Sequence, residues 1–159
     1  MIGRTHDPCL PPRMTTSTGY TLETRVGRLI EARVTRLRTR DDANRYSEAL
    51  GAEVARLPRQ RAAILCADHR PIVVYPQPVT DRLVELFQVM NTRLERIAIF
   101  VSPTNATLLM QLERLVREAA FSKRRVFREP SAGLVHLGES LDPAELARAR
   151  AFLDEYRPA

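Results

Sequence analysis

The stretch AAILCADHRP, residues 62–71, decides how the rest of the chain is interpreted. An uninterrupted apolar run leads up to Asp68, and His69 and Pro71 follow it. A short apolar run of this kind is typical of a strand that is covered on both faces of its sheet. Polar residues and a proline are typical of the turn that ends such a strand. We therefore expect a buried strand whose carboxyl end lies at Asp68.

A second buried strand is expected at RIAIFVS, residues 96–102, and a helix separates the two strands. Thr80 and Asp81 are expected to begin this helix, with Thr80 as its N-cap. Strands that are joined by a helix run parallel and have a right-handed crossover. The proposed helix also has apolar residues at helical spacing; they are Leu83, Leu86, Phe87, Met90 and Leu94.

Upstream of residue 62 the pattern changes to alternation. Residues 20–26 and 28–37 alternate between apolar and polar side chains, which predicts an antiparallel hairpin. Thr39 and Asp42 have the spacing of a capping box and predict the start of an amphipathic helix that ends before Pro58.

Downstream the chain alternates between helix and strand. A helix is expected over residues 108–119, a short strand at RRVF, residues 124–127, and a short helix over residues 129–138. Asp142 is the expected N-cap of a last helix. The predicted fold class is α/β: a mixed sheet of four to five strands packed with helices, with an opening β-hairpin followed by alternating α and β.

Length and composition fit one globular domain. The chain has 159 residues, of which 44% are hydrophobic and 28% charged, close to globular averages. Residues 1–18 combine several prolines with a TTST run and are expected to form a flexible tail. The predicted domain therefore spans residues 19–157.

The cellular setting follows from the cysteines and the apolar runs. Cys9 lies in the proline-rich tail and Cys66 in the buried strand, a poor basis for a disulfide framework. No stretch approaches the ~20 apolar residues of a membrane span, and the N-terminus lacks the apolar centre of a secretion signal. We expect a cytoplasmic protein.

The predicted order of elements resembles the STAS domain superfamily, and within it the SpoIIAA-like branch, also described as STAS/SEC14-like. The opening hairpin, the strands AAILCAD and RIAIFVS, and the ending RRVFREPSAGLVHL carry this resemblance, which covers roughly residues 20–137. It implies a STAS-like fold and a non-enzymatic module that binds a protein partner in bacterial-type signalling.

The resemblance also implies a possible phosphorylation switch at the start of the helix after the central strand. PQPVTD occupies that place, so Thr80 and Asp81 become candidates for a switch or a partner-binding site. The family's motif of Asp, Ser and a small residue before Gly is absent here, and Thr80 is the only hydroxyl at the matching position. Ser102 and Thr104, at the start of the next helix, allow the same two interpretations: helix capping or modification.

Asp68 and His69 are candidates because ligands bind at the carboxyl ends of parallel strands. On an extended strand Cys66 and Asp68 point to one face of the sheet and His69 to the other, which argues against a shared metal or substrate. Cys66 is interpreted as a small buried hydrophobe and Asp68 as a strand-ending turn residue. No zinc spacing, nucleophile elbow, Walker loop or Rossmann glycine pattern occurs. We therefore predict no enzyme, cofactor or metal site.

Two other functions stay open beside the protein partner. The SEC14-like resemblance suggests a carrier of an apolar small molecule or lipid near Phe87, Met90 and Phe100. The formal net charge of +6 suggests electrostatic binding of nucleic acid through the arginine-rich residues 33–40 or 123–128. Neither run is interleaved with the aromatic side chains that stack on bases, which favours a solvated basic surface instead.

Overall fold

The computed structural model describes residues 15–17, 19–58 and 62–157. These residues form an α/β domain with the predicted succession of an opening hairpin and alternating helices and strands. The elements in chain order are β1 (Thr15–Ser17), β2 (Tyr20–Glu23), β3 (Leu29–Val34), α1 (Arg40–Arg56), β4 (Ala63–Asp68), α2 (Gln77–Met90), β5 (Leu94–Phe100), α3 (Ala106–Ala119), β6 (Arg124–Phe127), α4 (Pro130–Gly138) and α5 (Pro143–Asp154).

The strands form one mixed sheet in the order β1-β2-β3-β4-β5-β6. The pairs β1–β2 and β2–β3 are antiparallel, and β3 through β6 run parallel. The predicted buried strand is β4, which lies between β3 and β5 and pairs Leu65 with both Ile30 and Ile97. Its central place explains its apolar sequence, because helices cover both of its faces.

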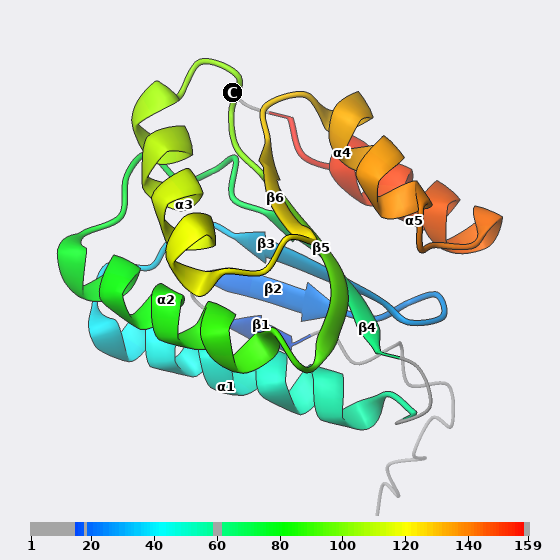
Figure 1. Cartoon of the computed structure of the whole chain (residues 1–159), viewed down its shortest axis with the longest axis horizontal. Helices are drawn as coiled ribbons and strands as arrows, with labels where there is room; N and C mark the ends of the chain where they lie inside the picture. Colours follow the sequence, from blue (N-terminus) through cyan, green and yellow to red (C-terminus); the bar gives the residue numbers. More distant parts are fainter. Residues whose placement is uncertain (1–14, 18, 59–61, 158–159) are drawn as a thin grey trace, which may run out of the picture.

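Helices cover the sheet on two sides (Figure 1). α1, α2 and α3 bury the larger core, which contains Leu65 and Ala67 of β4. α4 and α5 bury a smaller core on the opposite face, which contains Ile64 and Cys66. Successive residues of β4 therefore enter different cores, as the two-residue period of a strand requires.

Several helix boundaries agree with the capping signals of the sequence. The side chain of Thr39 accepts a hydrogen bond from the backbone N–H of Asp42, and the Asp42 side chain reciprocates, so α1 begins with a complete capping box. Asp142 and Glu145 form the same motif at α5. These caps satisfy backbone donors that would otherwise be unpaired at a helix start.

The start of α2 differs from the prediction. The helix begins at Gln77 with Pro76 as its N-cap, so Thr80 lies one turn inside the helix. The Thr80 hydroxyl donates to the carbonyl oxygen of Gln77 at 2.9 Å and does not cap the helix. Pro78 explains the shift, because a proline in the first helical turn loses no intrahelical hydrogen bond.

The predicted tail also needs a correction. Residues Thr15–Ser17 form β1 and pair with β2, so the sheet has six strands and begins inside the predicted tail of residues 1–18. Threonine favours strands, but the segment TTS is too short to show a periodic pattern, so only its pairing with β2 reveals the strand. Residues 1–14 and 18 lie outside the described part of the chain.

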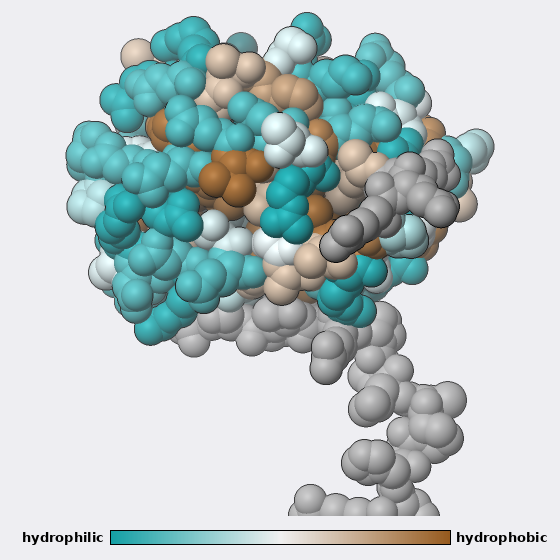
Figure 2. Space-filling model, turned by 60° about the horizontal axis from the view of Figure 1, so that its bottom comes forward, coloured by the Kyte–Doolittle hydropathy of each residue, from teal (hydrophilic) through white to brown (hydrophobic). Residues whose placement is uncertain are grey.

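The surface is mainly hydrophilic on the face that Figure 2 shows, where the bottom of the Figure 1 view comes forward and apolar side chains form smaller patches. Scattered apolar side chains of this kind are normal for a folded protein. Within the described residues, no helix has the length and apolar character needed to cross a bilayer.

Candidate functional site

The candidate site lies at the carboxyl edge of the parallel strands, where the connections after β3, β4 and β5 meet. Ligands of open α/β sheets bind at this edge. Asp68 ends β4 and His69 follows it, and both are almost fully buried. Their side chains serve the two different faces of the sheet, as the strand period predicts.

Asp68 is the centre of an ion-pair cluster on the α5 face. Its Oδ2 accepts from Nε of Arg33 at 2.9 Å, and its Oδ1 accepts from Nε of Arg70 at 2.8 Å. Its Oδ1 also accepts from the Arg70 backbone N–H, as expected of a turn aspartate. Burial by itself would raise the pKa of the Asp68 carboxyl, but the hydrogen bonds from Arg70 and Arg33 outweigh burial and hold the pKa below its usual value.

The same two arginines hold the end of α5. Arg33 Nη2 donates to the carbonyl oxygen of Phe152 at 2.6 Å, and Arg70 Nη2 donates to that of Leu153 at 2.8 Å. Both guanidinium groups also lie over the ring of Tyr156. Cations near the carbonyl end of a helix interact favourably with its dipole. The cluster therefore holds the end of α5 against the sheet.

His69 lies on the opposite face, among α1, α2 and α3. Its Nδ1 is 2.6 Å from the hydroxyl oxygen of Tyr75, and its backbone N–H donates to the carbonyl oxygen of Phe100. Burial lowers the pKa of His69 to about 4, against a weaker opposing effect of the Asp68 charge. The imidazole is therefore neutral at physiological pH, and its Nδ1 is in hydrogen-bond contact with Tyr75. This gives His69 a structural role, which the sequence left undecided.

The connection from His69 to α2 has a backbone fixed by α3. The Asn105 side chain donates to the carbonyl oxygens of Ile72 and Val73, at 3.2 and 2.8 Å. The Gln111 side-chain amide bonds both backbone groups of Tyr75, accepting from its N–H at 3.0 Å and donating to its carbonyl oxygen at 2.9 Å. With the His69–Tyr75 contact, these bonds fix both ends of the segment.

The fixed segment exposes two apolar side chains. Val73 is 76% exposed and Val74 is 52% exposed, whereas Ile72 and Tyr75 on either side are buried. Residues 71–74 form one wall of a shallow groove of about 270 Å³, and the segment after β3 forms the other wall. The groove is lined by Thr35, Arg36, Leu37, Arg38, Pro71, Ile72, Val73 and Val74.

The groove is not lined by any of the candidates for a switch or partner-binding site that the sequence suggested, which are Asp68, His69, Thr80, Asp81, Ser102 and Thr104. Thr80 is only 1% exposed, so its hydroxyl does not face solvent. Asp81 is exposed and accepts a hydrogen bond from the Gln77 side chain at 2.8 Å. The hydroxyl oxygens of Ser102 and Thr104 lie 3.3 Å apart in the connection that precedes α3. Asp68 and His69 lie beneath the loops and support them.

Asn105 and Gln111 are site residues that sequence reasoning missed. Asn105 is the true N-cap of α3 and accepts from the backbone N–H of Leu108 at 3.0 Å. Asparagine is a more favourable N-cap than threonine, so the sequence alone contained a reason to prefer Asn105 to Thr104 as the N-cap of α3. Gln111 has no such signal, because only the tertiary structure places α3 beside Tyr75.

The residues of the predicted lipid site do not come together. Phe87 and Met90 belong to the larger core and Phe100 to the smaller one, so the sheet separates them. The cavity that Phe87 and Met90 help to line has a volume of about 10 Å³, which suits no more than one water molecule. The strand period explains the separation, because Phe100 and Ile99 of β5 face opposite ways.

The two arginine-rich runs are not continuous basic surfaces. Arg33 is engaged with Asp68, whereas Arg36 and Arg38 are exposed. Arg124 is 2% exposed and donates to the Asn91 side chain and to the carbonyl oxygen of Phe87, so it closes the end of α2. Its burial lowers the pKa of Arg124 to about 10, still well above physiological pH.

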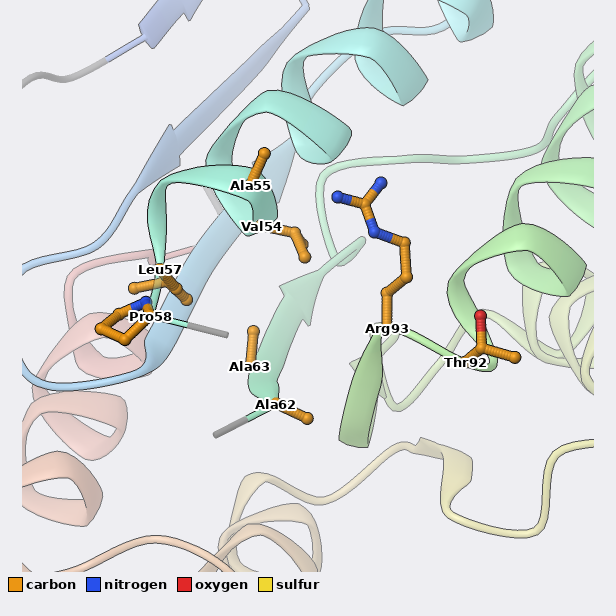
Figure 3. A pocket seen from close by; sticks show the side chains of 8 residues that line it. All are labelled: Val54, Ala55, Leu57, Pro58, Ala62, Ala63, Thr92 and Arg93. Atoms are coloured by element: carbon orange, nitrogen blue, oxygen red, sulfur yellow. The ribbon is translucent and has the colours of Figure 1, made fainter. Parts of the chain in front are cut away.

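A second hollow, of about 430 Å³, lies at the amino edge of the sheet between the end of α1 and the starts of β4 and β5 (Figure 3). Arg93 is the charged side chain that Figure 3 shows there, and it extends toward α1, where Nη2 lies 3.5 Å from the carbonyl oxygen of Gly51. Amino edges of parallel strands are not where such sheets bind ligands. We therefore favour the groove at the carboxyl edge.

The part of the chain that the structure describes holds no cluster of three His, Cys, Asp or Glu side chains placed to bind a metal ion. Comparisons with models of known protein families, with curated proteins and with solved structures each return no match.

Proposed function

We propose that this protein is a non-enzymatic module that binds a protein partner through the groove beside Val73 and Val74. The observation that carries the proposal is the exposure of two neighbouring valines on a loop whose backbone is fixed by Asn105 and Gln111. Exposed apolar side chains next to a groove are typical of interaction sites.

The fixed backbone favours binding because a preordered surface loses little conformational entropy when a partner docks. Loops that carry function on a rigid scaffold are common in α/β domains. The neutral, occupied His69 and the ion-paired Asp68 support a binding role over catalysis, since neither side chain is free to act on a substrate.

The wider setting of the proposal is a STAS-like, SpoIIAA-like regulatory or scaffolding module in the cytoplasm. The order of the elements and the mixed sheet support the resemblance. The free, buried thiol of Cys66 is compatible with a reducing compartment. Because Thr80 is buried, the proposed contact surface does not require a modified Thr80.

The test uses affinity capture of the tagged full chain from cells, followed by quantitative mass spectrometry. Val73→Asp combined with Val74→Asp should abolish capture of the specific partner, because two carboxylates would have to be desolvated in the interface. Val135→Asp, at a position on α4 that is 71% exposed, is the matched control and should leave capture unchanged. A partner retained equally by all three proteins would refute the proposed surface.

A further inference from the structure

The groove beside Val73 and Val74 has one apolar wall and one basic wall. Residues 35–38 continue from β3, and Leu37 in their middle is 3% exposed. Successive side chains of an extended segment point in opposite directions. Leu37 points into the core, so Arg36 and Arg38 on either side of it point away from the core. Both arginines are exposed, and neither forms an ion pair with another described residue.

The basic wall is as fixed as the apolar one. The backbone N–H groups of Thr35 and Arg36 donate to the carbonyl oxygen of Gly19 at 2.8 and 3.0 Å. Gly19 has a φ of 134°, and a side chain there would overlap the backbone of Arg36, so only glycine allows this contact. At the other end, the backbone N–H of Arg38 donates to the Asp42 side chain at 2.9 Å.

We propose that the groove takes an extended segment of a protein partner in which acidic and apolar residues alternate. The apolar side chains of the segment would contact Val73 and Val74, and its carboxylates would pair with Arg36 and Arg38. In an extended peptide alternate side chains face opposite directions, which matches two facing walls of different chemistry. The proposal rests on the proposed function and names the chemistry of the partner.

Charge supports an acidic segment over a neutral one. The chain has a formal net charge of +6, so an acidic partner is attracted from a distance as well as in the groove. Guanidinium groups bind carboxylates through paired N–H donors. No carboxylate of a described residue forms an ion pair with Arg36 or Arg38, so their donors can bind carboxylates of a partner.

The experiment uses a short fluorescent peptide of alternating Asp and Leu, and a control peptide with Asn in place of Asp. Fluorescence anisotropy should show tighter binding of the Asp peptide by roughly three- to tenfold, as expected for exposed ion pairs. The preference should disappear in the Arg36→Ala, Arg38→Ala variant. It should persist in the Arg117→Ala, Arg150→Ala variant, which removes the same charge at exposed positions on α3 and α5.

Other outcomes would overturn the proposal. Failure of the Asp peptide to bind, equal binding of both peptides, or an unchanged preference after loss of Arg36 and Arg38 would each exclude it. Tighter binding of a single-stranded oligonucleotide that depends on the same arginines would assign the groove to nucleic acid. Concentration-dependent dimerisation that Val73→Asp abolishes would assign it to a second copy of the chain.

These outcomes are separable from those of the proposed function. If a cellular partner depends on Val73 and Val74 but not on Arg36 and Arg38, the interaction surface stands and the acidic chemistry fails. If the peptides bind as expected but no cellular partner depends on the valines, the groove chemistry stands and the proposed function fails.

Discussion

At the residue scale, Asp68 and His69 show how strongly the two faces of one strand end can differ. Asp68 is charged because two guanidinium groups bind it, while His69 is neutral because burial lowers its pKa. Both residues are buried, so each depends on its partners for hydrogen bonds. Their state of ionisation therefore couples to folding.

The low pKa of His69 predicts a pH dependence of stability. Its pKa is about 4 in the folded protein and 6.5 as the unperturbed value, so the unfolded chain binds more protons between these values. The free energy of unfolding should therefore fall as the pH falls from 7 to 5, by about 2 kcal/mol from His69 alone. Urea denaturation at both pH values measures the change.

His69→Asn is the informative variant for this prediction, because it removes the titrating group and keeps a polar atom near Tyr75. Burial lowers the pKa of His136 as well, so that residue adds to the same trend and only the difference between the two proteins reports on His69. If the variant keeps the full pH dependence of the parent protein, the assigned role of His69 is wrong.

At the scale of the elements, two glycines in helices have opposite roles. Gly133 lets α4 approach β5, because a methyl group there would overlap the ring of Phe100. Gly51 in α1 has only ordinary contacts at 3.8 Å, with side chains of Arg93 and Met90. One glycine is required by packing and the other only weakens its helix.

Alanine substitution should separate the two positions. Gly51→Ala should stabilise the protein by up to about 1 kcal/mol, since alanine has the better helix propensity. Gly133→Ala should destabilise it by about 1–3 kcal/mol, because α4 must move away from Phe100 or strain the contact. Thermal unfolding of both variants gives the comparison, and equal effects at both positions would contradict the packing of α4.

The elements also show which sequence signals are local. Both capping boxes were predictable, because their donors and acceptors are separated by three residues. The predicted start of α2 lies too late in the chain, because Thr80 resembles an N-cap whereas the actual cap is Pro76, with Pro78 in the first turn. Proline is compatible with a helix at its first turn, and that property applies here.

At the scale of the whole molecule, the Asp68 cluster joins β3, β4 and α5 above the core that contains Cys66. Removing the carboxylate would leave Arg33 and Arg70 partly buried without a counterion. Loss of one partner from such a cluster is strongly destabilising, by about 3 kcal/mol or more. Opening of α5 would then expose Cys66.

The reactivity of Cys66 toward a thiol reagent measures this opening. In a Cys9→Ser background Cys66 is the remaining cysteine, and burial and the raised pKa of its thiol should make its native labelling slow. Asp68→Asn should accelerate labelling by about a hundredfold or more, as a loss of about 3 kcal/mol or more in stability implies. Asp154→Asn makes the same chemical change at an exposed site and should have little effect; equal rates in all three proteins would contradict the role of the cluster.

The sequence by itself determined the α/β class, the covered strand β4 and the opposite directions of Cys66 and His69. Each of these depends on periodicity or on spacing between neighbours in the chain, which local stereochemistry translates directly into structure. Only the tertiary structure decided that Arg33 lies beside Asp68, because that contact follows from the register of β3 against β4. It also decided that Asn105 and Gln111 fix the loop that exposes Val73 and Val74, since hydrogen bonds between distant segments form only once the helices are packed.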